Sequence, residues 1–173
     1  MSLWSKDQFR LKNNSMVQIR PSEFWDAELL VDMYSNLSQE TIYNRFFVFR
    51  SLSMEEAKRI ATVSSKDEIA LVGAISSHQT SHLLADARIY IQGEKGEIGI
   101  VVRDEWQDKG LGTALVDRLI KVGRKVGLKR LFMYCLPDNV RIIHIGQKLG
   151  FRYRKSDLGV IRLEIILDET VSK

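Results

Sequence analysis

Apolar residues alternate and then run together near the middle of the chain, at Ile98, Ile100, Val101 and Val102. Because most of these side chains are β-branched, the pattern predicts a strand. After a polar loop, five apolar residues recur at spacings of four, four, three and four, which is typical of a helix packed on a sheet. They are Leu111, Leu115, Leu119, Val122 and Val126. The centre of the chain is therefore expected to run from strand through loop to helix.

The same reasoning divides the remainder of the chain. Further strands are expected at residues 17–20, 68–76, 82–91 and 130–136, with a final hairpin of 151–154 and 160–167. Further helices are expected after Ser22, after Ser38, after Ser53 with Glu56 as its capping-box partner, and at 140–149. In the helix after Ser22, Trp25 is expected on the apolar face.

The connections between these elements predict the sheet. The strand at 98–102, the helix that follows it and the strand at 130–136 form a β-α-β unit, so these two strands should be parallel with a right-handed crossover. The other strands are joined by hairpins and should be antiparallel. We therefore expect an α+β fold, with a mixed sheet and helices on both faces. A single domain should span residues 17–173, after a loosely held polar arm at 1–16.

Composition narrows the class of protein. The chain has 173 residues and a net charge of +4, but its Lys and Arg are scattered, so a solvated surface is favoured and a nucleic-acid partner is unlikely. With Cys135 as the single cysteine there is no internal disulfide, and the three histidines form no metal-ligand pattern with it, so no metal is expected. The longest apolar run, residues 69–75, is too short to cross a membrane, and no signal peptide is evident. These features favour a cytoplasmic protein, either a monomer or a homodimer.

The loop before the central helix has the character of an anion site. Gly110 and Gly112 lie where free backbone N–H groups and the positive end of the helix dipole converge. The spacing does not fit a Walker A loop, which needs four residues between its glycines and a following lysine. It does not fit a dinucleotide fingerprint either, because Leu115 stands where a third glycine is required. The pattern that fits is Gln107, two residues, Gly110, one residue, Gly112.

This pattern after an apolar strand resembles the acyl-CoA loop of the GCN5-related N-acetyltransferase (GNAT) family. A second motif agrees: Asn139 precedes a helix that ends at Gly150-Phe151, as in the corresponding segment of that family. The likeness covers residues 17–167. It implies the acyl-CoA N-acyltransferase fold, a mixed, mostly antiparallel sheet with a central splayed pair of parallel strands flanked by helices.

A closer likeness lies upstream. Residues 37–47, 68–72 and 101–107 resemble the bacterial and archaeal protein lysine acetyltransferases of the Pat type. One part of it, the group Arg45-Phe46-Phe47, can equally be explained as core anchoring with Arg45 at the rim.

The resemblance implies a site for acetyl-CoA, used as a co-substrate. The backbone of Ile100, Val101 and Val102 would bind pantetheine in the gap between the splayed strands, as an added strand would. The diphosphate would be held by backbone donors of the loop, where glycines allow close approach. The predicted cofactor-binding residues of the loop are Gln107, Asp108, Lys109, Gly110, Leu111, Gly112 and Thr113, and Asn139 joins them.

The acceptor amine needs a base. A lysine with a pKa of about 10.4 is almost entirely protonated at pH 7 and is then no nucleophile. Glu97, at the start of the central strand, resembles the glutamate that removes this proton in related enzymes. The alternative is a solvated charge beside the Gly96 turn. The tyrosine that protonates the leaving thiolate in many family members is replaced by Gly146, which puts such an acid in doubt.

Three functions remain open from the sequence. The first is acetyl transfer from acetyl-CoA to a protein lysine by direct attack in a ternary complex. The second is the same chemistry on a small amine such as a polyamine, an amino acid or an antibiotic. The third is a CoA-binding sensor without turnover, which Glu97 and the intact loop argue against and Gly146 leaves open.

Overall fold

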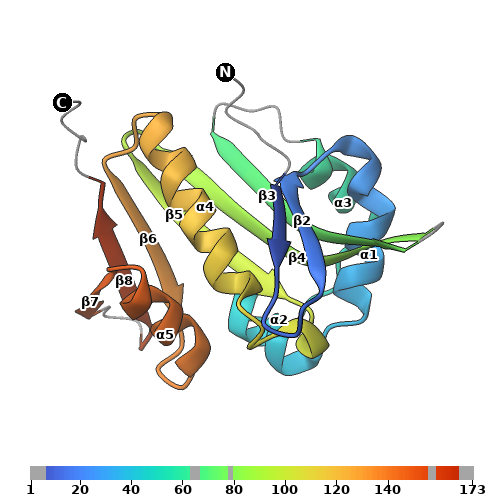
Figure 1. Cartoon of the computed structure of the whole chain (residues 1–173). Helices are drawn as coiled ribbons and strands as arrows, with labels where there is room; N and C mark the ends of the chain where they lie inside the picture. The colour runs from blue at the N-terminus through green and yellow to red at the C-terminus, as the bar shows by residue number, and fades with distance from the viewer. Residues whose placement is uncertain (1–6, 63–66, 78–79, 156–158, 168–173) are drawn as a thin grey trace.

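Eight strands form one sheet in the computed structural model (Figure 1), which describes residues 7–62, 67–77, 80–155 and 159–167. Their order across the sheet is β1-β2-β3-β4-β5-β6-β8-β7. The strands are β1 (Asp7–Arg10), β2 (Met16–Pro21), β3 (Glu68–Ser77), β4 (Thr80–Gln92), β5 (Lys95–Val102), β6 (Arg130–Cys135), β7 (Arg152–Lys155) and β8 (Ile161–Ile166). Among the described strands, only the central pair, β5 and β6, is parallel, which confirms the predicted mixed sheet.

Helices cover both faces of the sheet (Figure 1). The helices are η1 (Phe24–Asp26), α1 (Ala27–Ser35), α2 (Gln39–Phe46), α3 (Met54–Ala61), η2 (Asp104–Trp106), α4 (Leu111–Lys125) and α5 (Val140–Lys148). One apolar core lies under α4 and α5, and the other lies between α1, α3 and strands β3 to β5. In the described part of the chain, no helix is both long enough and apolar enough to cross a membrane.

Periodicity explains why α4 packs as it does. Leu111, Leu115 and Leu119 have no exposed surface and lie on the face that meets the sheet. The predicted stripe ends one turn earlier than expected, because Val126 is the C-cap residue and is 42% exposed. Gly127 follows with a φ of 84°, a left-handed conformation that glycine adopts without strain and that commonly ends a helix.

The parallel strands separate partway along their length. Pairing between β5 and β6 covers Lys95 with Arg130, Gly96 with Leu131 and Glu97 with Phe132, and stops there. β5 continues to Val102 against β4, and β6 continues to Cys135 against β8. Each strand therefore keeps its outer partner while the inner pair diverges, which is the splayed geometry expected from the sequence.

The prediction of a loosely held N-terminal arm is wrong for residues 7–16. β1 pairs antiparallel with β2 from Asp7 to Arg10. Leu11 is only 2% exposed and belongs to the core under α4. The polar composition of the segment concealed this, because an edge strand needs few apolar residues to bury its inner face.

The prediction for the start of the first helix is also wrong. Ser22 does not cap it, and its hydroxyl is buried without a hydrogen-bond partner among the residues that the structure describes. Glu23 and Asp26 instead form a reciprocal capping box around η1, and Asp26 also pairs with the buried Arg20 at 2.7 Å. Trp25 is 57% exposed and so does not join the apolar face.

The other two helix starts agree better with the sequence. The Ser38 hydroxyl accepts a hydrogen bond from the Thr41 N–H, and that of Ser53 accepts one from the Glu56 N–H. The second half of the predicted box at Ser53 is missing, because the Glu56 carboxylate pairs with Arg50.

Replacing Leu11 with alanine tests whether the N-terminal strand belongs to the core. We expect Leu11→Ala to lower the free energy of unfolding by about 3 kcal/mol, because the shorter side chain leaves a cavity in the packed core. Chemical denaturation measures this change. Gln8→Ala, at an exposed position of β1, is the control and should change it by less than about 0.5 kcal/mol. Equal, small effects of both variants would show that the segment is held as loosely as its composition suggests.

Candidate functional site

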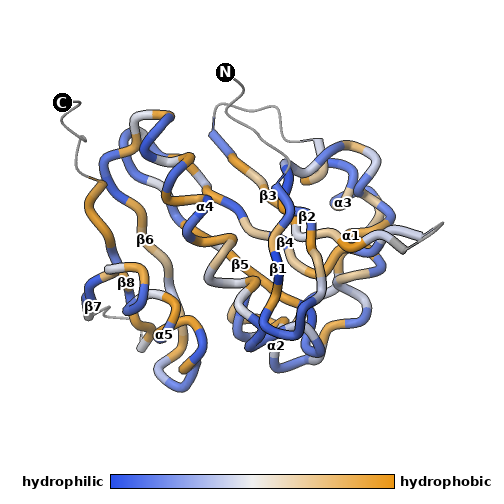
Figure 2. Tube along the Cα trace, viewed as in Figure 1, coloured by the Kyte–Doolittle hydropathy of each residue, from blue (hydrophilic) through white to orange (hydrophobic). Residues whose placement is uncertain are grey.

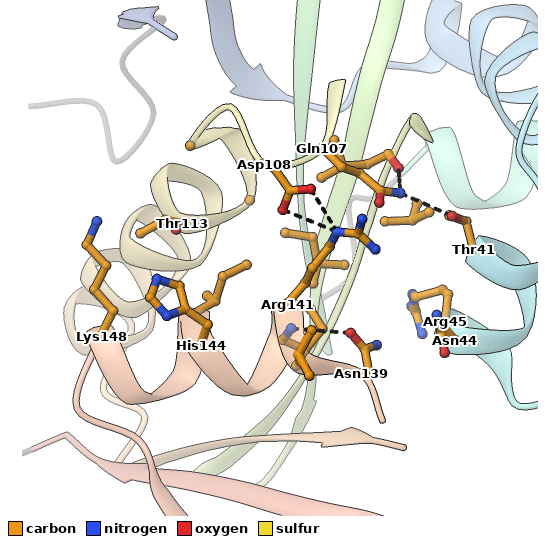
Figure 3. Close-up of a pocket in the computed structure, with 18 of the residues that line it drawn as sticks. Thr41, Asn44, Arg45, Gln107, Asp108, Thr113, Asn139, Arg141, His144 and Lys148 are labelled. Carbon is orange, nitrogen blue, oxygen red and sulfur yellow. Dashed lines mark hydrogen bonds and ion pairs between the residues drawn. The ribbon is translucent and has the colours of Figure 1, made fainter. Parts of the chain in front are cut away.

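A cavity of about 530 Å³ opens where β5 and β6 separate (Figure 3). Its walls come from β5, from the loop before α4, from α5 and from α2. Nine of the predicted cofactor-binding residues line it: Ile100, Val101, Val102, Gln107, Asp108, Gly110, Gly112, Thr113 and Asn139. The volume is in the range of small-molecule sites.

Three predicted site residues do not line the cavity. The side chain of Leu111 is fully buried in the core, and the Lys109 ammonium bonds to the backbone carbonyl of Glu105. Glu97 lies on β5 directly between Tyr90 and Phe132, at the last paired position before the strands separate. Side chains alternate along a strand, so Glu97 shares the face of Gly99 and Val101, which is the face covered by α1 to α3.

The loop before α4 is shaped by residues in left-handed conformations. Asp108 has a φ of 60° and Gly110 one of 92°. A Cβ at Gly110 would meet nothing within 4 Å, whereas one at Gly112 would lie 3.0 Å from the Ile145 side chain. Gly110 is the N-cap of α4 and offers no side-chain cap, and the first turn has no acidic residue. The first N–H groups of this 15-residue helix are therefore available to an anion.

Gln107 acts as a brace between elements. Its side-chain amide donates to the carbonyl of Val102 at 3.0 Å and to the hydroxyl of Thr41 at 3.1 Å. The contact with Val102 lies at the end of β5, and the contact with Thr41 reaches α2 (Figure 3). The glutamine of the motif thus positions the loop, while the glycines supply the open surface.

Asp104 ties the same region to the start of α2. Its carboxylate accepts hydrogen bonds from the N–H and hydroxyl of Ser38, at 2.9 and 2.6 Å, and from the hydroxyl of Thr41 at 2.7 Å. Partial burial works to raise the pKa of Asp104, but these hydrogen bonds outweigh it and lower the pKa. Asp104 and Gln107 together fix α2 against the end of β5.

Basic groups gather at the mouth of the cavity. Arg141 on α5 pairs with Asp108 at 3.1 Å, and His144 and Lys148 lie further along the same helix (Figure 3). Lys12, in the β1–β2 turn, also lines the cavity, and its N–H bonds to the carbonyl of Lys109 at 3.1 Å. No local pattern in the sequence indicates Lys12, because this residue reaches the site only through the pairing of β1 with the sheet.

The side of the cavity that faces α2 carries Asn44 and Arg45 (Figure 3). Arg45 is partly buried and donates to the hydroxyl of Tyr90 at 3.3 Å. Phe46 packs against the second core and Phe47 closes α2 in a left-handed conformation. The structure therefore separates the Arg45-Phe46-Phe47 group into a cavity residue, a packing residue and a helix cap.

The sequence matches the Acetyltransferase (GNAT) family over residues 23–151. The chain belongs to this family. It is 28% identical over 160 residues to the acetyltransferase Pat of Mycolicibacterium smegmatis, a match that covers 86% of this chain and 47% of that protein. The chain thus spans about half the length of this curated relative.

Two solved structures show the same fold. The GNAT domain of S. lividans PAT superposes with a TM-score of 0.85 at 27% identity, covering 94% of this chain and 97% of that one. The yncA protein of Salmonella typhimurium, solved with its cofactor acetyl-CoA, superposes with a TM-score of 0.72 at 18% identity, over 90% of this chain and 96% of that one.

The structure explains why no tyrosine takes the position of Gly146. A Cβ at Gly146 would lie 2.7 Å from the side chain of Leu163, so β8 fills the space there. Tyr134 packs edge-on against Phe132 with 5.7 Å between ring centres, and Tyr153 is 60% exposed. Neither tyrosine lines the cavity. Burial raises the pKa of Cys135 to about 11, so this thiol is not a nucleophile at neutral pH.

Asp104→Asn tests the brace between α2 and β5. At pH 7 we expect it to lower the free energy of unfolding by about 1 kcal/mol, because an amide cannot accept all three hydrogen bonds. The expected loss is small because the site is exposed to solvent. The lowered pKa makes this contribution present at neutral pH and lost as the pH falls through it. The difference between wild type and variant should therefore shrink below about pH 4. Denaturation measured against pH checks both points, with the exposed neighbour Glu105→Gln as control. A difference that is independent of pH would contradict the role of the charge.

Proposed function

We propose that the chain is an acetyl-CoA-dependent N-acetyltransferase whose acceptor is a lysine of another protein. The observation that carries the proposal is the cavity at the splayed strands, bounded by the backbone of β5 and the glycine-capped start of α4, in a chain of the GNAT family. The Pat relative and the PAT domain, at 28% and 27% identity, support a protein lysine as acceptor.

The residues present fit an acyl-CoA donor. Beyond Glu97, β5 has no strand partner on its β6 side within the described residues, so its backbone can pair with the amides of pantetheine. The start of α4 suits a diphosphate, because its N–H groups have no side-chain cap and Gly110 leaves the approach open. Lys12, Arg141 and Lys148 add positive charge on the rim of the same cavity. Acetyl-CoA would supply the thioester that is attacked.

Glu97 is the base in this proposal. It stands at the last position where β5 and β6 pair, so the strands separate directly after it. It is partly buried on the face of β5 that leads toward α2. From there the carboxylate can take a proton from an amine that approaches the β5 backbone, directly or through a water. A backbone N–H of residues 100–102 would polarise the thioester carbonyl.

Gly112→Asp tests the donor site. An aspartate adds a negative charge at the start of α4 and bulk against Ile145, so we expect the affinity for acetyl-CoA to fall by about tenfold or more. Isothermal titration calorimetry measures the affinity. The control Gln147→Asp adds the same charge at an exposed position of α5 that does not line the cavity. Unchanged affinity in a folded Gly112→Asp protein would refute the assignment of the loop.

Glu97→Gln tests the base. We expect kcat to fall by about 100-fold or more at pH 7 while the affinity for acetyl-CoA stays the same. The deficit should shrink as the pH approaches about 10, where lysine is neutral without help. Glu94→Gln, in the turn of the same hairpin, is the control and should keep the wild-type rate. If Glu97→Gln keeps its full rate and pH profile, Glu97 is only a surface charge.

The acceptor class is tested by following thiol release from acetyl-CoA with folded proteins, lysine peptides and small amines. Release with protein lysines alone supports the proposal. Preferred release with free amines would assign a small-molecule acceptor. Binding of acetyl-CoA without release across the panel would indicate a sensor.

A further inference from the structure

The guanidinium of Arg45 lies flat against the backbone of the central strand. A Cβ added at Gly99 would overlap the Cζ and both terminal nitrogens of Arg45, so a larger residue there would push the guanidinium aside. Gly99 immediately precedes Ile100, which lines the cavity. Arg45 lines the cavity as well (Figure 3). It therefore places a positive charge one residue from the backbone that we propose to hold the thioester.

No carboxylate in the described part of the chain forms an ion pair with Arg45. The Tyr90 hydroxyl, 3.3 Å away, is neutral, because partial burial raises the pKa of Tyr90. Asp86 and Glu68, on the same face of the sheet, both bond to Arg88, at 2.9 and 2.7 Å. Glu97 lies two residues from Gly99 on the same face but forms no ion pair with Arg45 among the described residues. Arg45 thus lines the cavity without a carboxylate partner among the described residues.

Arg50, a neighbouring arginine, has different surroundings from Arg45. Arg50 stacks on the same Phe46 ring as Arg45, at 4.9 Å against 4.8 Å from guanidinium carbon to ring centre. Arg50 pairs with the carboxylate of Glu56 and does not line the cavity. Arg45 therefore differs from Arg50 in lying over Gly99, in the wall of the cavity, and in having no ion pair among the described residues.

We propose that Arg45 binds a carboxylate of the substrate next to the reacting carbon. A guanidinium held flat on a strand presents its planar edge and can form two parallel hydrogen bonds with a carboxylate. Two sources bring a carboxylate there: the far end of a dicarboxylic acyl chain on CoA, or an acidic residue beside the acceptor lysine. In either case Arg45 determines specificity and takes no part in proton transfer. This inference rests on the proposed acyl-CoA chemistry of the same cavity.

The donor arm of the test compares succinyl-CoA with acetyl-CoA by isothermal titration calorimetry, which needs no turnover. The quantity of interest is the ratio of the two affinities. If the acyl chain supplies the carboxylate, Arg45→Gln should lower the preference for succinyl-CoA by about tenfold or more. Arg50→Gln removes an equal charge from the same aromatic ring outside the cavity and should leave the ratio as in wild type.

The acceptor arm compares the affinities of two lysine peptides in the presence of saturating CoA. One peptide has aspartates beside the lysine and the other has asparagines. If the acceptor supplies the carboxylate, Arg45→Gln should abolish a preference of wild type for the aspartate peptide, while Arg50→Gln keeps it. Salt should weaken that preference in wild type, since ion pairs are screened.

Gly99→Ala gives an independent variant that keeps the charge. Its methyl group would displace the guanidinium, so it should shift the same ratio in the same direction as Arg45→Gln. If Arg45→Gln and Gly99→Ala leave the ratios of affinities unchanged in both arms, the inference is wrong. The proposed function then still stands. If neither CoA ester binds to the wild-type protein, both the inference and the proposed function fail.

Discussion

The divergence of β5 from β6 is the constraint on which the rest of this structure depends. A parallel pair inside a sheet normally stays paired along its length, because each unpaired backbone group that is buried costs free energy. Here each strand pairs over a longer stretch with its outer neighbour. β5 pairs with β4 as far as Val102, and β6 pairs with β8 as far as Cys135. The gap between them exposes strand backbone to a cavity, which a fully closed sheet would not provide.

Helix α2 borders the cavity at this gap and is fixed to the segment after β5. Its first turn is held by Asp104, and Thr41 also receives the side chain of Gln107 from the loop before α4. Asp104 and Gln107 belong to the segment that joins β5 to α4, so one short connection positions both the anion-binding loop and the helix that bears Arg45. Hydrogen bonds thus join the loop before α4 directly to the first turn of α2.

Charge is distributed unevenly around the cavity. Lys12, Arg141 and Lys148 occupy the rim near the start of α4, as a site for a phosphate-bearing ligand requires. Along the chain, the central strands β3 to β6 are mostly apolar, whereas polar residues are frequent in the helices and loops (Figure 2). Arg45 lies apart from the rim cations, against the backbone of β5, and so serves a different part of the substrate.

The sequence by itself determined the order of the elements, the central β-α-β unit and the glycine loop. These depend on local patterns, namely the periodicity of apolar residues, the capping serines and the spacing of Gln107, Gly110 and Gly112. Asn139 came from the resemblance to the GNAT family, and it does cap α5, through a hydrogen bond from the Ile142 N–H.

Only the tertiary structure decided which distant residues join this loop. Lys12 arrives through the pairing of β1 with β2, and Arg45 through the docking of α2 on β5. It also decided that Leu163 fills the space beside Gly146. Contacts of this kind depend on the packing of elements far apart in the chain, and no local pattern encodes the distance between them. The glycine at residue 99 shows the difference: in sequence it is one small residue within a strand, and in the fold it is the space that Arg45 occupies.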